Sequence, residues 1–236
     1  MSLPSATLLR LMAWLSPSFP VGAFSYSHGL EYAVESGLVR DLPTTVDWIT
    51  TVLLHGSGRI DADLFVQAHG IASRLGAVDD DPAALDGISI LADAWRGTPE
   101  LALESSAQGN AFVLAVDAAW PDPFWSRWRS HLKADRRQPA YAVAVAVAAA
   151  RADIPLPTAL AAFLHAFAAN LVSAAVRLIP LGQSDGQRAI AALETMVLHA
   201  TDAAMVRPPE DRGGGLPMLD WCSISHETQY TRLFRS

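Results

Sequence analysis

The residues best suited to chemistry are a cysteine and a histidine near the C-terminal end of the sequence. Cys222 is the only cysteine, and His226 follows it four positions later. Side chains four apart meet on one helix face, so a thiol and an imidazole at this spacing can form a nucleophile and its base. This pair, or a His/Glu pair in a core pocket, supports the alternative hypothesis of a small all-α enzyme. The pair follows a glycine-rich stretch, however, and catalysis requires rigid positioning. We therefore expect no catalytic residue.

Metal and nucleotide chemistry have little support in the sequence. The seven histidines include no His-x-x-x-His pair, and no Cys-x-x-Cys is present to place two ligands on one metal. His28 and Glu31 lie three apart, but a single such pair does not specify a metal site. A Walker loop needs a glycine-bounded lysine, and the only lysine, Lys133, has no glycine loop beside it. We expect no metal site, no cofactor and no nucleotide hydrolysis.

Arg177 is the only charged side chain in the apolar stretch 156–181. Such an arginine either extends into solvent from a helix end or is paired in a polar site. Gln183 and Arg188 follow closely and are candidates for the same polar patch. Both interpretations of Arg177 stay open at this point.

The composition favours a protein-binding role. Hydrophobic residues make up 51% of the chain and charged residues 17%, enough for a large core and for apolar surface that another protein covers. The net charge of −7 argues against nucleic acid, whose binding proteins usually carry a basic face. A single cysteine excludes an internal disulfide and fits a reducing compartment, and the first residues lack a secretory signal. We expect a cytoplasmic protein.

The stretch Leu156–Leu181 is the best candidate for a membrane span, since it is long enough to cross a bilayer about 30 Å thick. It carries His165, Asn170 and Arg177, each of which would be costly in hydrocarbon. We therefore expect a buried core helix and no membrane association.

Charge is unevenly distributed along the chain. Residues 61–122 hold eleven acidic and two basic side chains, whereas residues 127–137 hold five basic side chains and one acidic. Such blocks are usually solvated faces, and the alternative is an electrostatically complementary docking surface.

Hydrophobic residues recur at helical spacing along nearly the whole chain. The alternating valines of residues 142–147 resemble a strand, but no second strand-like run exists to pair with them, so we expect a buried helix of small residues. The fold class is therefore all-α: a single compact bundle of roughly ten helices with a flexible C-terminal tail. The expected helices cover residues 8–15, 27–37, 43–53, 60–74, 83–95, 100–119, 125–137, 139–152, 157–178 and 184–206.

The character of the sequence changes after Val206. The stretch PPEDRGGG at 208–215 cannot hold a helix and is typical of a flexible linker. The aromatic residues beyond it, Trp221, Tyr230 and Phe234, are typical of a docking peptide. We expect an all-helical domain over residues 1–206, and a flexible linker with a C-terminal docking tail over residues 207–236.

Three separated segments together resemble one known family. They are WLSPSFPVGAFSYSHGLE at 14–31, ANLVSAAVRLIPLGQ at 169–183 and HETQYTRLFRS at 226–236. In this order they resemble the urease accessory protein UreF. The resemblance is weakest over residues 70–128 and 138–152, so no interface residues are carried over from the family there.

The resemblance to UreF implies a cytoplasmic, homodimeric, all-helical protein without a cofactor that acts in urease maturation. The implied partners are UreD (UreH in some systems), the GTPase UreG and urease apoprotein. The protein would bridge UreD and UreG and help couple GTP hydrolysis to nickel insertion. The first motif offers an exposed junction between loop and helix. The expected partner-interface residues are Tyr26, Ser27, His28, Glu31, Arg177, Gln183, Arg188, His226, Tyr230, Arg232, Leu233, Phe234 and Arg235.

Overall fold

The computed structural model describes residues 5–75 and 80–236, and within these ranges it contains helices and no strand. The predicted all-α fold class is confirmed. The helices are α1 Ser5–Trp14, α2 Leu30–Glu35, α3 Leu42–His55, α4 Ser57–Ala72, α5 Asp86–Ala94, α6 Pro99–Ala119, α7 Pro123–Ala134, α8 Tyr141–Arg151, α9 Leu156–Leu178, α10 Gln183–Val206 and α11 Pro217–His226. Short 3-10 turns are η1 Ala23–Ser25, η2 Pro82–Leu85 and η3 Pro209–Asp211.

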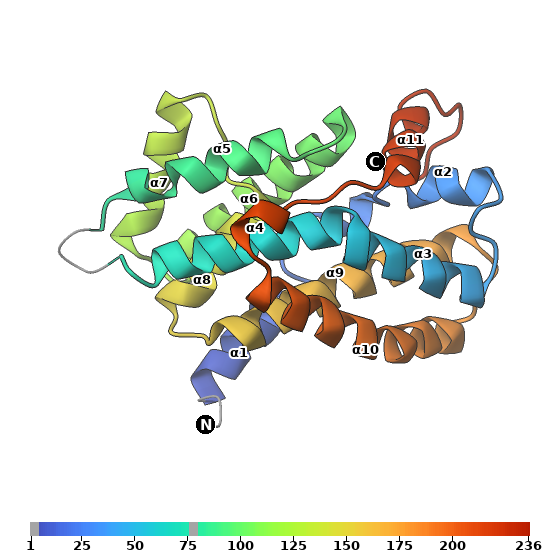
Figure 1. Ribbon diagram of the computed structural model, residues 1–236, viewed down its shortest axis with the longest axis horizontal. Coiled ribbons are helices and arrows are strands. Elements are labelled where there is room, and N and C mark those ends of the chain that lie inside the picture. The colour runs from blue at the N-terminus through green and yellow to red at the C-terminus, as the bar shows by residue number, and fades with distance from the viewer. Residues whose placement is uncertain (1–4, 76–79) are drawn as a thin grey trace.

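The helices form one bundle around α4, α8 and α9 (Figure 1). Helix α8 lies between α4 and α6, while α9 lies beside α10, which also contacts α3. Helices α5 and α7 stand at one end of the bundle, and α2 and α11 stand together at the other end. Residues 30–35 and residues 217–226 therefore lie together at one end of the molecule.

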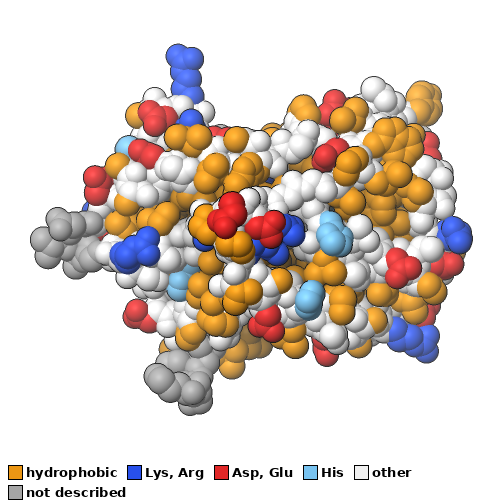
Figure 2. All heavy atoms as spheres, viewed as in Figure 1, with side chains coloured by type: hydrophobic (Ala, Val, Ile, Leu, Met, Phe, Trp, Pro, Cys, Tyr) orange, Lys and Arg blue, Asp and Glu red, His pale blue; other side chains and the backbone are white. Residues whose placement is uncertain are grey.

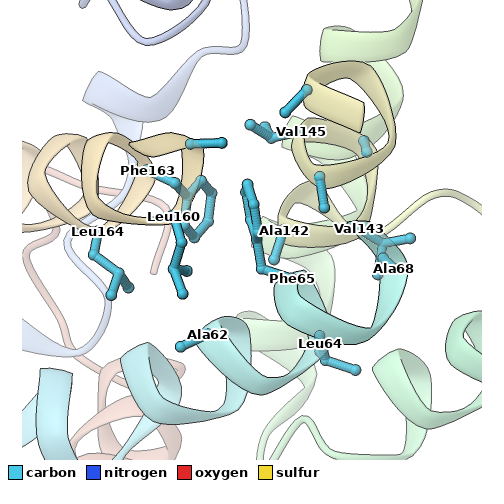
Figure 3. Packing of buried hydrophobic residues seen from close by; sticks show 14 of the residues in the cluster. Ala62, Leu64, Phe65, Ala68, Ala142, Val143, Val145, Leu160, Phe163 and Leu164 are labelled. Carbon is cyan, nitrogen blue, oxygen red and sulfur yellow. The ribbon is translucent and has the colours of Figure 1, made fainter. Parts of the chain in front are cut away.

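Helix α8 is the buried helix of small residues that the sequence predicts. Every residue from Ala142 to Ala150 is buried, which explains why its valines and alanines show no polar face. Figure 3 shows Phe65 of α4 and Phe163 of α9 meeting beside this helix, with ring centroids 5.3 Å apart. Small side chains on α8 let the larger residues of its neighbours fill the core at close packing.

A glycine on α6 fixes how the chain enters α8. A Cβ at Gly109 would overlap the carbonyl oxygen of Pro139, two residues before α8 begins. Ser105, one turn earlier on α6, accepts a hydrogen bond from the backbone nitrogen of Tyr141 at 3.4 Å. The backbone before α8 therefore rests directly on α6, and only glycine leaves room for it.

Part of the acidic stretch is paired with basic residues inside the chain. Arg151 contacts Asp80 at 2.7 Å and Asp122 at 2.6 Å, and it lies over the Phe124 ring at 4.3 Å from the centroid. Arg137 of the basic block pairs with Asp93 of α5 at 3.0 Å. These charges join α5, the end of α8 and the loops on either side of α7, an arrangement that neither of the two sequence interpretations foresaw.

Two helices, α9 and α10, are long and apolar enough to cross a membrane by length and composition. Half of the apolar stretch in α9 and a third of that in α10 are buried against the rest of the protein. In α9 the buried face packs on α10, α4 and α8, as expected for a core helix.

The predicted flexibility of the C-terminal tail is not confirmed. Arg59 of α4 donates hydrogen bonds to the main-chain oxygens of Asp211 and Gly213, both at 2.6 Å. Asp63, one turn along α4, accepts the Gly213 N–H at 2.8 Å and pairs with Arg207. Because the half-buried Arg59 and the buried Asp63 of α4 satisfy its backbone, the glycine-rich stretch follows a defined path to α11.

Candidate partner interface and the polar network beneath it

The C-terminal segment, residues 227–236, lies on the first motif of the chain. Two backbone hydrogen bonds join them: Ser27 N–H donates to the Ser236 oxygen at 2.7 Å, and Arg235 N–H donates to the Ser25 oxygen at 2.8 Å. The Ser27 hydroxyl also donates to the Ser236 oxygen. Two motifs separated by most of the sequence therefore form one structural unit.

Glu31 of α2 holds the C-terminal segment through its carboxylate. One oxygen accepts the Leu233 N–H at 2.6 Å, and the other accepts the Phe234 N–H at 2.9 Å. The second oxygen also contacts Nε2 of His226 at 3.0 Å. Glu31 is buried, so these three donors replace the water that an ionised carboxylate would otherwise require.

His226, near the end of α11, links Glu31 to α6. Its ring is fully buried, and its Nδ1 lies 2.9 Å from the carboxylate of Glu100. Both ring nitrogens face carboxylate oxygens, so both contacts are hydrogen bonds only when the ring carries two protons. Burial raises the pKa of the Glu100 carboxyl, against the opposing effect of His226. Arg232 adds a looser contact to Glu100 at 3.6 Å.

Glu104, one turn further along α6, is a second buried carboxylate with several donors. Its oxygens lie 3.1 Å from His28 Nδ1, 3.1 Å from Gln108 Nε2 and 2.9 Å from the Ser236 hydroxyl. Burial acts to raise the pKa of Glu104, but the charge of His28, the hydrogen bonds from His28 and Ser236, and Arg96 outweigh it and lower the pKa. The other nitrogen of His28 contacts the Ser57 hydroxyl, which ties α4 into the network.

The middle motif reaches the same place through Arg177. Its guanidinium lies over the Phe234 ring, 4.2 Å from the centroid, while Phe234 itself is buried. Arg177 is exposed at the end of α9, so it extends into solvent and stacks on an aromatic ring at once. Gln183 is exposed on α10, and the exposed Arg188 contacts Asp185 at 2.7 Å. No hydrogen bond in the described part of the chain joins Gln183 or Arg188 to Arg177.

The predicted exposure of the first motif is wrong. Tyr26, Ser27, His28 and Glu31 are all buried, and α11 and the C-terminal segment bond directly to Ser27 and Glu31. His28 also lies outside α2, with a positive φ of 58°. Whether these side chains touch a partner stays a prediction, and within the chain Ser27 and Glu31 hold the C-terminal segment in place.

Gly29 allows α11 to pack closely against the turn before α2. Its φ is +76°, a left-handed conformation that favours glycine. A Cβ there would lie 3.3 Å from the Ser223 nitrogen and 3.5 Å from the Cys222 Cβ, both on α11. The glycine therefore serves both the turn before α2 and the contact with α11.

The outer face of this unit is apolar. Trp221 of α11 is 46% exposed and Leu233 is 63% exposed, while Ile224 and Tyr230 are also exposed. Trp221 packs edge-on against Tyr32 of α2, with ring centroids 5.1 Å apart. Figure 2 shows hydrophobic side chains gathered on the surface where Figure 1 places α2 and α11. Arg232 and Arg235, both exposed, belong to the same segment.

The geometry does not favour thiol chemistry. Cys222 and His226 share α11, as their spacing predicts, but Cys222 is fully buried among apolar residues such as Leu30 and Phe234. Burial raises the pKa of the Cys222 thiol to about 11, which disfavours the reactive thiolate. His226 directs both nitrogens to glutamates and none to the thiol.

One group of potential metal ligands lies elsewhere in the part of the chain that is described. Asp86, His131 and Asp135 come from α5, α7 and the residue after α7. His131 is already hydrogen-bonded to Asp86 at 2.7 Å, and all three side chains have access to solvent. An ion pair at the surface accounts for this group.

Comparison with known proteins defines the class. The family model for UreF matches residues 39–194. A urease accessory protein UreF from Granulibacter bethesdensis is 51% identical over 231 residues, covering 98% of this chain and 94% of the relative. UreF proteins from Magnetococcus marinus and from Rhodopseudomonas palustris strain BisB5 are 44% and 46% identical, covering 98% of this chain and 98% and 92% of the relatives.

These relatives are accessory proteins and not enzymes. The chain belongs to the UreF family. The three motifs that the family resemblance rests on are the segments that the structure brings together around Glu31 and Phe234.

Proposed function

We propose that this protein is a cytoplasmic, homodimeric scaffold for urease maturation. It bridges UreD (UreH) and the GTPase UreG on urease apoprotein and helps couple GTP hydrolysis to nickel insertion. Membership of a family of urease accessory proteins supports this role. The observation that carries the bridging role is the exposed apolar face of α11 and the C-terminal segment, held on a buried polar network.

The apolar face has the composition of a protein interface. Aromatic and arginine side chains contribute most to binding at interfaces, and this face offers Trp221, Tyr230 and Arg232. Leu233 and Ile224 add exposed apolar area that a folded protein usually covers only with a partner. We assign UreD to this face.

The network beneath the face lowers the cost of binding. A disordered tail loses conformational entropy when a partner orders it. Here Glu31 and His226 already fix the segment in the free chain, so its exposed side chains are presented in place. Such preorganisation strengthens binding without additional contacts.

Co-purification with UreD tests the assignment. The double variant Trp221→Ala/Leu233→Ala removes one large exposed apolar side chain from α11 and one from the segment. We expect it to keep its helicity, to lose UreD and to fail in a urease activation assay. The control Leu198→Ala removes an exposed side chain of α10 and should behave as wild type. Full retention of UreD by the double variant would remove this face from the proposal.

The coupling role needs its own measurement. UreG should hydrolyse GTP at a different rate in the complex with this protein and UreD than alone. If the rate is unchanged while urease is still activated, the protein acts as a scaffold only. Sedimentation of the free protein tests the proposed homodimer.

A further inference from the structure

A cleft of about 610 Å³ opens beside α1 and α9, and its lining includes His28 and Glu104 of the polar network. Its walls are apolar and include Leu11 of α1, Phe19 and Phe163. Figure 3 shows Phe163 at the inner side of α9, where its ring meets the core. Cavities of roughly 300–1,000 Å³ with mainly apolar walls are typical of small-molecule sites.

The floor of the cleft is polar and contains an unused donor. Arg96 lines it with a side chain only 4% exposed, bonded through Nη2 to Asp61. The Nε of Arg96 is buried and has no hydrogen-bond partner among the described residues. A buried donor without a partner costs free energy, so a ligand that accepts this hydrogen bond stabilises the site.

Tyr141 adds a second polar group to the floor. It lines the cleft, and its hydroxyl has no hydrogen bond within residues 5–75 and 80–236. Burial raises the pKa of Tyr141, so its hydroxyl stays protonated and can both donate and accept. Gln108 lines the same floor and uses its amide nitrogen on Glu104.

The carboxylates on the floor already have partners. Asp61 pairs with Arg96, and Glu104 lies within hydrogen-bond distance of His28 and Gln108. An ionic head group would find no unpaired counter-ion among these residues, and a buried charge without a counter-ion is strongly unfavourable. The floor therefore suits a head group that forms hydrogen bonds and carries no net charge.

We propose that this cleft binds an uncharged amphiphilic small molecule. Its apolar body lies between α1 and α9, and its amide head accepts a hydrogen bond from Arg96 and reaches the Tyr141 hydroxyl. This site is separate from the proposed UreD face and does not depend on the proposed function.

Calorimetric titration of the full chain with octanamide tests the proposal. Octanoate and octylammonium, which have the same chain length, serve as charged comparisons. We expect saturable one-to-one binding of octanamide, with both ions binding about ten-fold more weakly or not at all. Tyr141→Phe removes one hydrogen bond and should weaken octanamide binding about five-fold. Since that hydroxyl has no partner in the described structure, the variant should fold normally.

A pair of alanine variants separates the cleft from the rest of α9. Ala166 lines the cleft and Ala161 does not, and both are partly exposed on the same helix. Ala166→Phe should fill the cleft and abolish binding, while Ala161→Phe should leave it intact. Absence of saturable octanamide binding, tighter binding of either ion, or unchanged binding by Ala166→Phe would each overturn the proposal.

Discussion

Nε2 of His226 lies 3.0 Å from the carboxylate of Glu31, although the two residues stand 195 positions apart in the sequence. Both side chains are buried, and the contact joins α2 to α11. The first motif of the family therefore binds the C-terminal segment of the same chain. The position of the exposed face that we assign to UreD depends on this contact.

Removing the Glu31 carboxylate should destabilise the protein. Glu31→Ala leaves His226 and the backbone N–H groups of Leu233 and Phe234 without their acceptor. Breaking one side of a buried pair typically costs about 3 kcal/mol. We expect a loss of this size in the free energy of unfolding, measured by chemical denaturation. Glu35→Ala, on the exposed side of α2, should change it little. Equal effects of the two variants would contradict the network.

The close approach of α2 and α11 is tested at Gly29. Gly29→Ala places a Cβ 3.3 Å from the Ser223 nitrogen at a φ of +76°. Gly37 has nearly the same φ, +75°, but open space around it. Gly37→Ala should therefore destabilise the protein only through the cost of a positive φ for alanine, roughly 1 kcal/mol in the free energy of unfolding. Thermal melting should place Gly29→Ala clearly below Gly37→Ala, and coincident melting curves would show that the contact is unimportant.

The lowered pKa of Glu104 gives the stability a defined pH dependence. A carboxyl whose pKa is lower in the folded than in the unfolded protein stabilises the fold above its unfolded pKa. The ordinary value is 4.5, so this contribution is present at pH 7 and is lost as the pH falls through the lower folded pKa. The destabilisation caused by Glu104→Gln should be largest near pH 7 and shrink below pH 4.5. Urea denaturation at several pH values measures this difference, and a constant difference would contradict it.

Cys222 should be unreactive in the folded protein. With its pKa raised to about 11, only roughly a thousandth of the thiol is ionised at pH 8. Alkylation by iodoacetamide should therefore be slow in native protein and fast in denaturant. Cys222→Ala should still support urease activation. Rapid native alkylation together with loss of activation would return the thiol enzyme to consideration.

Much of the fold could be predicted from the sequence, because helices depend on local spacing. The buried helix α8 follows from the absence of a partner strand for the valines of 142–147. The position of the C-terminal segment could not be predicted in this way. It depends on Arg59 and Asp63 of α4 and on Glu31 of α2, and none of these has a local signal that points to residues 207–236.

In the candidate site, too, the segments could be predicted from the sequence, whereas the contacts between distant residues could not. The three motifs lie together in the structure, but exposure is a property of the folded chain that the motifs do not encode locally. His28 and Glu31 are polar and looked solvent-facing, whereas a distant segment covers them. Glu100 was not expected in the site, since its role depends on His226, 126 positions away.

The contact between the first and last motifs also bears on the order of events during synthesis. Glu31 leaves the ribosome about 195 residues before the first of its donors, which lie at positions 226, 233 and 234. Until these donors are made, the carboxylate is more stable in water than buried without partners. The contact between α2 and the C-terminal segment therefore cannot form until residues 226–234 have been synthesised.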